Sequence, residues 1–463
     1  MKAFILHMST SLLAAILLMA AAVSCVEPFT PVDPFDGSFT LAFQVSVPNA
    51  GSLATKAETI TPEEEESEVH ELQIWAFKSG DNGAAVAYRN ILSTSTPQSG
   101  IYEGTLTLPR SLVTADNPKL DFFVIANDAA IGNVEKKDGD NDVTGTMTRS
   151  ELIAWTFGKS GTGQAATDYF GTTTKVDAVS NDGLPMSCFD VTGFDITFLQ
   201  YGLTTLQMAA IQAKATGSTK DSPYALSAFD EGPNQLSDTQ KDYIQNTLCP
   251  RPTGSTAYPS WSTLWGKLCP SFQLKRAVSK IRFVFTKAQN MSESTEIVSI
   301  EVFSDESGQG AIPGTTYLFE HDPVLPDNPT FEKLTWGSSS APLLINGSIK
   351  TIDTPHRLLW TSGMTAQAYT NLLNTARNRD EITEKRLYLR ESDRALKCKI
   401  SYKIGDTPGE ATFALPDGVN FHRNSWWTIY AFFMSYKLNF QVTVNDDWDT
   451  YGKGAISVAG NVN

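Results

Sequence analysis

The sequence predicts an all-β fold of two antiparallel β-sandwich domains in tandem, with a partly helical insertion between them. Short segments alternate between apolar and polar residues, which is the pattern of half-buried strands. Turn residues separate these segments, since 32 glycines and 23 prolines are spread over 463 residues. A chain of this length agrees with two or three domains, and short strands divided by turns are typical of antiparallel sandwiches.

The first strand is predicted at residues 38–47, where the alternation is strict. One face of this strand carries Phe39, Leu41, Phe43, Val45 and Val47, and the other face is mostly polar. The polar segment 48–68 follows and predicts an exposed loop that is open to proteolysis. Further strand-like runs complete a first domain predicted for 38–194, and they lie at 71–77, 101–108 and 120–126.

Residues 195–270 have a different character and are predicted to form the insertion. Ser237 and Gln240 have the spacing of a capping box, which predicts the start of a helix. Loops punctuated by proline and glycine surround this helix and contain Trp261 and Trp265. Strand-like runs then return in a second domain predicted for 271–463, at 271–286, 296–303, 385–390, 396–403 and 410–415. This domain ends in another strict alternation, with one face made of Leu438, Phe440, Val442 and Val444.

The first 25 residues predict export as a lipoprotein. Lys2 precedes an apolar stretch at 11–23, which is too short to span a bilayer comfortably. Small residues lead directly to Cys25, as in the box that lipoprotein signal peptidase recognises. We therefore predict a signal peptide at 1–24, lipidation at Cys25, and an extended tether at 25–37 that contains three prolines. An ordinary secretory signal with a chance cysteine is the alternative.

Four cysteines remain besides Cys25, namely Cys188, Cys249, Cys269 and Cys398. Export permits disulfides, and Cys249 and Cys269 are the predicted pair because they are nearest in sequence. Four thiols nevertheless allow three pairings, and the other two stay open. The chain has no C-x-x-C motif, so no metal site is predicted.

The composition and the motifs argue against several classes of function. A formal net charge of −15 disfavours nucleic-acid binding, which needs clustered lysine and arginine. The chain has neither an H-E-x-x-H motif nor a G-x-S-x-G motif. We therefore predict no catalytic residue, no cofactor and no enzymatic activity. A glycosidase pair of carboxylates stays an open alternative, because it needs proximity in space rather than in sequence.

Several short motifs occur along the chain in a defined order. They are the box at Cys25, the pair Lys56-Ala57, the strand Val69 to Phe77, residues 120–127, Leu184 to Ser187, Leu274 to Ile281, Arg423-Asn424 with the strand after it, and Trp448. In this order they resemble the Bacteroidetes fimbrillin family, the subunits of type V pili. The resemblance covers nearly the whole chain.

This resemblance implies two transthyretin-like β-sandwiches and transport to the outer membrane as a lipoprotein. It also implies a protease that cuts after a basic residue, here between Lys56 and Ala57, and thereby removes the lipid and the strand 38–47. A strand of a neighbouring subunit then fills the groove, so that the filament grows by strand addition. The alternation from Leu438 to Val444 is the candidate donor strand, with an ordinary core strand as the alternative.

Lys56 departs from the family pattern, because the well-known members carry arginine at the cut. Either a different protease acts, or the strand stays in place and the protein is an uncleaved lipidated anchor. The predicted function is a structural fimbrial subunit at the surface of the outer membrane and in the fimbrium. Its predicted partners are other fimbrial subunits, the processing protease, and host or bacterial surface ligands.

A surface glycan-binding adhesin lipoprotein is the alternative from a different class. Aromatic rings on an exposed loop would favour it, and the candidates are Trp261, Trp265, Trp426 and Trp427. The competing interpretation is that these rings pack in the core.

Overall fold

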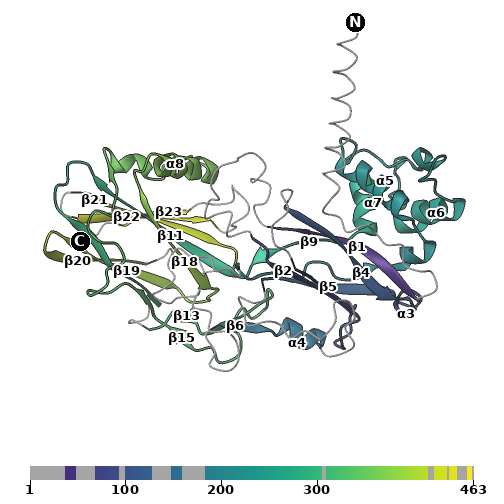
Figure 1. Cartoon of the computed structure of the whole chain (residues 1–463), viewed down its shortest axis with the longest axis horizontal. Coiled ribbons are helices and arrows are strands. Elements are labelled where there is room, and N and C mark those ends of the chain that lie inside the picture. The colour runs from purple at the N-terminus through teal and green to yellow at the C-terminus, as the bar shows by residue number, and fades with distance from the viewer. Residues whose placement is uncertain are drawn as a thin grey trace, which may run out of the picture.

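In the computed structural model, the described residues are 37–47, 68–92, 100–127, 147–158, 183–304, 309–414, 422–434, 437–445 and 456–460. β-Sheet is their dominant structure, and it forms two groups of packed sheets towards the two ends of an elongated molecule (Figure 1). Cys25, Lys56, Ala57 and Trp448 lie outside the described residues. None of the helices in these ranges is long and apolar enough to cross a membrane.

Two sheets build the first sandwich. Their strands are β1 (Ser38–Ser46), β2 (Glu71–Lys78), β3 (Ala87–Leu92), β4 (Ile101–Pro109), β5 (Lys119–Ala126), β7 (Met186–Cys188), β8 (Phe194–Asp195), β9 (Ser271–Gln273) and β10 (Lys275–Arg276). One sheet has the order β4-β1-β9, and the other has the order β10-β7-β5-β2-β3 with β8 paired to β5. Side chains from both sheets, such as Leu41, Leu72 and Phe122, fill one buried core.

A helical segment covers one side of this sandwich. It contains the 3-10 turns η3 (Thr197–Tyr201) and η4 (Leu226–Phe229), the helices α5 (Thr205–Thr216), α6 (Asp238–Tyr243) and α7 (Trp261–Leu268), and the π-helical turn η5 (Ile244–Leu248). The predicted capping box is confirmed, because Ser237 and Gln240 bond reciprocally at the start of α6. Figure 1 shows these helices beside β1, β4 and β9. Their buried side chains, Leu264 among them, belong to the core of the first sandwich.

The second sandwich also consists of two sheets. Its strands are β11 (Val278–Ala288), β12 (Thr295–Ser304), β16 (Leu334–Trp336), β17 (Thr351–Ile352), β18 (Thr383–Arg390), β19 (Leu396–Ile404), β20 (Thr407–Ala414), β21 (Trp426–Met434), β22 (Lys437–Asn445) and β23 (Ile456–Gly460). The orders are β17-β11-β21-β22-β23, with β18 also paired to β11, and β16-β12-β19-β20. Helix α8 (Ala366–Asn378) and the 3-10 turn η6 (Pro355–Leu358) pack through Leu373 and Leu358 on the outer face of the first of these sheets.

Among the described residues three strand pairings are parallel, which corrects the prediction of antiparallel sheets. β1 pairs in parallel with β9, and β11 pairs in parallel with β17 and β21. A long stretch of chain separates the partners in each case, which leaves room for the crossover that a parallel pair requires. The alternation of residue types that predicts a strand carries no information on the direction of a distant partner.

The predicted strand 271–286 is divided between the two sandwiches. Its first part forms β9 and β10, which pair with β1 and β7 of the first sandwich, while β11 lies in the second. Leu274 and Ala277, which lie before and after β10, are fully buried. Because buried apolar residues continue through the crossing, the sequence pattern does not show where the chain changes sandwich.

A third apolar cluster joins the two sandwiches. Leu152 of α4 (Arg149–Ile153) and Phe157 of β6 (Thr156–Gly158) belong to it. Three short strands, β13 (Ile312–Pro313), β14 (Thr315–Tyr317) and β15 (Phe331–Glu332), lie in the same part of the sequence as the second sandwich, and Ile312 belongs to the core of that sandwich. β6 pairs with β14, and the cluster includes Phe123, Phe319 and Trp426. A hydrophobic junction of this kind restricts the motion of one sandwich relative to the other.

Candidate functional site

Strand β1 lies in the middle of the three-stranded sheet of the first sandwich. On one side it pairs with β4 along its whole length, from Ser38 opposite Pro109 to Ser46 opposite Ile101. On the other side it pairs with β9 only at its end, from Gln44 opposite Ser271. β1 is therefore both an integral strand and the first strand that the described chain contributes.

The apolar face of β1 points into the core, as the alternation predicts. Leu41, Phe43 and Val45 are at most 2% exposed, and Val47 is also buried. Phe39 is partly buried, and the Arg110 guanidinium lies 5.6 Å from the centroid of its ring. Burial of such side chains stabilises a fold by about 1.5–3 kcal/mol each. Loss of β1 would therefore expose a large apolar groove, whereas the role of these residues as a displaced strand stays a prediction.

Gly104 on β4 provides the space that Phe43 occupies. The two residues are opposite each other in the register, and a Cβ atom built on Gly104 would lie 2.6 Å from Cζ of the Phe43 ring. A side chain at this position would push the ring out of its site. The packing of β1 against β4 therefore requires a glycine at position 104.

Gly104→Ala is expected to destabilise the protein by about 1–3 kcal/mol, because the added methyl group overpacks the Phe43 site. Urea-induced unfolding measures this change. Gly266→Ala is the matched control, since Gly266 lies in α7 and a Cβ there meets no atom within 4 Å. That variant is expected to gain about 0.5–1 kcal/mol. Equal stability of the two variants would contradict the close packing of the Phe43 ring on Gly104.

Polar side chains connect β1 with the helices that cover it. Gln44 Nε2 donates to Glu103 Oε1 at 2.7 Å, and Gln212 Nε2 on α5 donates to the same oxygen at 2.7 Å. Trp265 Nε1 on α7 donates to Gln44 Oε1 at 3.4 Å. The sequence does not predict this network. The spacing of Trp261, Leu264, Trp265 and Leu268 is a helical signal that could have placed α7, but no signal points to Gln44.

Three of the four candidate donor residues lie in the core of the second sandwich. Leu438, Phe440 and Val442 are buried, and Val444 lies opposite Trp427 in the register. β22 pairs with β21 on one side and β23 on the other. In the chain as described, β22 therefore has the position of a core strand, and its role as a donor stays a prediction.

The predicted disulfide between Cys249 and Cys269 is not formed. Both thiols are free and buried, as are those of Cys188 and Cys398. Nearness in sequence does not bring two sulfurs to bonding geometry, and the helix α7 lies between these two cysteines. Burial, together with the hydrogen bond to Asp190, raises the pKa of the Cys188 thiol to about 12.

Four thiols per chain are expected to react with a thiol reagent after unfolding without reductant, if the chain begins at Val26 and so lacks Cys25. In the folded protein the same thiols are expected to react slowly, because all four are buried. Counting released chromophore per chain measures both states. A count of two after unfolding would show that a disulfide forms.

The tryptophans considered for glycan binding are all buried. Trp261, Trp265, Trp426 and Trp427 are at most 9% exposed, which favours their interpretation as core residues. The neighbouring Tyr258 is partly buried, and its ring lies 4.7 Å from that of Tyr224 and 4.3 Å from the Arg251 guanidinium. The four buried tryptophan rings offer no open face to a sugar.

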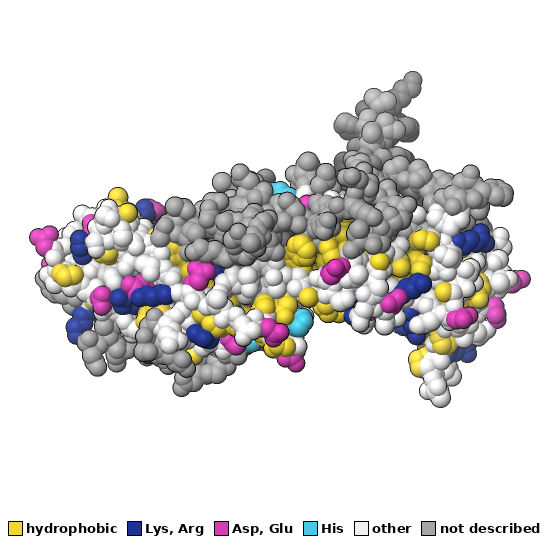
Figure 2. Space-filling view, turned by 90° about the horizontal axis from the view of Figure 1, so that it is seen from below, with side chains coloured by type: hydrophobic (Ala, Val, Ile, Leu, Met, Phe, Trp, Pro, Cys, Tyr) yellow, Lys and Arg dark blue, Asp and Glu magenta, His cyan; other side chains and the backbone are white. Residues whose placement is uncertain are grey.

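A hollow of about 340 Å³ lies at the end of the first sandwich, where β2 ends and β5 begins. Lys78, Asp81, Asn117 and Lys119 are among its lining residues, and they are exposed. The face in Figure 2 carries scattered basic and acidic side chains and no large patch of one sign. Among the described residues no group of His, Cys, Asp or Glu is arranged to hold a metal ion.

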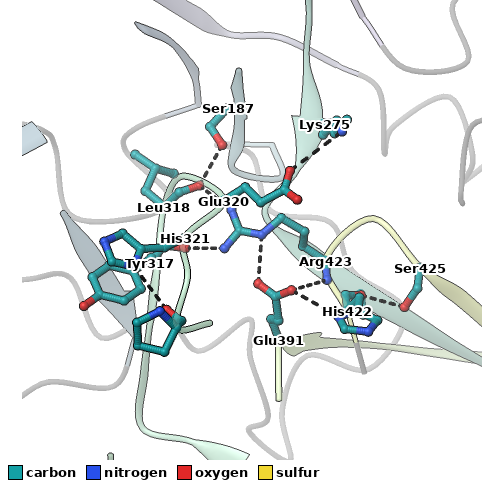
Figure 3. Close-up of polar contacts among 12 residues, drawn as sticks. Ser187, Lys275, Tyr317, Leu318, Glu320, His321, Glu391, His422, Arg423 and Ser425 are labelled. Atoms are coloured by element: carbon teal, nitrogen blue, oxygen red, sulfur yellow. Dashed lines mark hydrogen bonds and ion pairs between the residues drawn. The ribbon is translucent and has the colours of Figure 1, made fainter. Parts of the chain in front are cut away.

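Arg423 forms a buried polar junction between the two sandwiches (Figure 3). Its Nε lies 2.8 Å from Glu391 Oε2, and its Nη1 donates to the Leu318 carbonyl oxygen at 2.9 Å. Ser187 of β7 donates to that same oxygen at 2.6 Å. Burial alone would raise the pKa of Glu391, but the contacts with His422 and Arg423 outweigh it and hold the pKa below its ordinary value.

Comparisons with known proteins give structural likenesses only. No protein family matches the sequence, and no curated protein matches it. The tip fimbrial protein Mfa3 from Porphyromonas gingivalis, with a C-terminal truncation, is similar at 12% identity and a TM-score of 0.38, over 88% of this chain and 99% of that chain. A fimbrial assembly protein from Parabacteroides distasonis is similar at 10% identity and a TM-score of 0.39, over 89% of this chain and 99% of that chain. Both neighbours are fimbrial proteins of Bacteroidetes.

Proposed function

We propose that this chain is a structural subunit of a surface fimbrium and that the site of β1 is its joint to the next subunit. The observation that carries the proposal is the position of β1. It contributes apolar side chains that are almost completely buried, yet it is joined to β2 only through the polar segment 48–67. One cut in that segment separates β1 from the rest of the first sandwich.

Removal of β1 would leave a groove in the first sandwich that is stable only when another strand fills it. Val47 N donates to the Gly100 carbonyl and Arg110 N donates to the Gly37 carbonyl, both at the rim of the β1–β4 pair. These two bonds show which residue pairs of the ladder are hydrogen-bonded, because such pairs alternate along an antiparallel ladder. On β4, the backbone N–H and C=O groups that face β1 are therefore those of Tyr102, Gly104, Leu106 and Leu108. Unpaired backbone groups beside exposed apolar side chains are strongly unfavourable. A strand with alternating apolar residues satisfies both requirements.

In this proposal, export proceeds through lipidation at Cys25 and brings the chain to the outer membrane. A protease then cuts between Lys56 and Ala57, and the segment Leu438 to Val444 of a second subunit enters the groove. The two sandwiches are the two transthyretin-like domains of the subunit, and 195–270 is an insertion that belongs with the first. The partners are other fimbrial subunits and the protease.

A comparison of two recombinant chains tests this proposal. A chain that begins at Val26 keeps β1 and is expected to be monomeric, while a chain that begins at Ala57 is expected to form detergent-resistant multimers. A synthetic peptide of residues 38–47 in excess is the control, because it refills the groove and should keep the shorter chain monomeric. A shorter chain that stays folded and monomeric without the peptide would refute the proposal.

The second candidate function is an uncleaved lipidated anchor at the base of a fimbrium. One specific observation favours it, namely the contacts that β9 and the helices make with the far side of β1. Lys56 in place of an arginine favours it as well, because an arginine-specific protease would leave this chain uncut. Retention of the native N-terminus on the cell surface distinguishes the anchor from the assembling subunit.

A further inference from the structure

We propose that residues 197–274, which comprise η3 to α7, β9 and the adjoining Leu274, form a clamp that retains β1 in the first sandwich. Strand β1 then leaves its site only after this helical clamp has moved. The inference rests on the proposed function, since it concerns how replacement of β1 is controlled. The proposed clamp gives a role to the helical segment that lies, in sequence, between the strands of the first sandwich and those of the second.

Backbone hydrogen bonds attach the clamp to the end of β1. Gln44 N donates to the Pro270 carbonyl at 3.0 Å, and Leu274 N donates to the Ser46 carbonyl at 3.0 Å. β9 continues directly from α7, so the helix and this short parallel pair form one unit. The end of β1 that leads into the segment 48–67 is therefore held on both sides, by β4 and by the clamp.

Side chains connect the clamp with β1 a second time. Gln44 lies between Trp265 of α7 and Glu103 of β4, and Gln212 of α5 bonds to the same Glu103 oxygen. Helix α7 thus contacts Gln44 of β1 directly, and α5 contacts Glu103, the residue of β4 to which Gln44 is bonded. Withdrawal of β1 breaks the two bonds of Gln44, to Trp265 and to Glu103, whereas the bond between Gln212 and Glu103 stays in place.

Apolar packing makes the clamp part of the same core as β1. Leu264 and Leu268 of α7 and Phe272 of β9 are at most 1% exposed, and they belong to the cluster that contains Leu41 and Phe43. Loss of β1 would expose the inner face of the clamp as well as that of the sheet. The clamp therefore raises the free energy of opening for β1 beyond what β4 alone provides.

Hydrogen exchange on the chain that begins at Val26, which keeps β1, tests the clamp without requiring assembly. In Leu264→Ala, exchange of the β1 amides is expected to rise about tenfold or more, because a cavity in α7 weakens the contacts that retain the strand. The rise should exceed that of β2 in the same molecule. Leu373→Ala in α8 is the matched control, since Leu373 is also completely buried but packs on the second sandwich.

Trp265→Phe supplies a milder variant, which keeps an aromatic ring but removes the donor to Gln44. It is expected to raise β1 exchange about threefold, and it decides the question if Leu264→Ala does not fold. Exchange of β1 at the wild-type rate, or an equal rise in β1 and β2, would overturn the clamp. Neither result would bear on assembly, whereas monomeric behaviour of the chain from Ala57 would refute the proposed function and leave the clamp standing.

Discussion

Phe43→Ala is expected to lower the free energy of unfolding by about 3–5 kcal/mol, the range for truncating a buried phenylalanine. Phe43 is 2% exposed at the centre of β1, and its ring fills the space above Gly104. The neighbouring Gly104 has no side chain that could fill the cavity. Urea-induced unfolding, with the midpoint and slope fitted separately, measures the loss.

Thr107→Val is the control for this variant. Thr107 lies on β4 with its side chain exposed, so the change is expected to stay within about 0.5 kcal/mol. A loss below about 1 kcal/mol for Phe43→Ala would mean that the first sandwich does not depend on β1. The groove would then have little need for a replacement strand.

Arg423→Met is expected to cost about 3–5 kcal/mol, because it leaves the carboxylate of Glu391 buried without its main partner. Both side chains are less than 10% exposed, and Arg423 also donates to the carbonyls of Tyr317 and Leu318. The loss of these bonds should loosen the junction between the sandwiches. Unfolding in urea gives the stability, and small-angle scattering gives the change in overall dimensions.

Two further variants control for the effect of charge. Lys350→Met removes an ion pair with Asp380 that is largely exposed, and it is expected to cost at most about 1 kcal/mol. The double variant Arg423→Met with Glu391→Met should be more stable than Arg423→Met alone, since no charge is left buried. A double variant that is less stable than the single one would contradict this account of the junction.

The sequence predicts β1 well because only one of its faces is buried. Strict alternation then follows from the geometry of the strand, and the burial of Leu41, Phe43 and Val45 confirms it. The crossing at Leu274 and Ala277 is not predictable in this way, since both positions are apolar and buried as in a continuous strand. The parallel pairing of β9 with β1 joins residues far apart in sequence, which local patterns do not encode.

The site is predicted less completely than the fold. The prolines and glycines around them predict loops at Trp261 and Trp265, whereas both residues lie on α7, whose apolar residues recur at helical spacing. Arg423 belongs to the Arg423-Asn424 motif. The sequence does not show, however, that this residue among the 36 lysines and arginines is buried beside a carboxylate. The free state of Cys249 and Cys269 depends on side-chain directions that only the fold determines.

In the proposed assembly, β1 is removed and its site joins one subunit to the next. The most direct test is the intact mass and N-terminal sequence of the protein sheared from the native cell surface. We expect a chain that begins at Ala57 and runs as a detergent-resistant ladder of multimers. A monomeric chain that still begins at acylated Cys25 would contradict the proposed assembly and leave the lipidated anchor as the function.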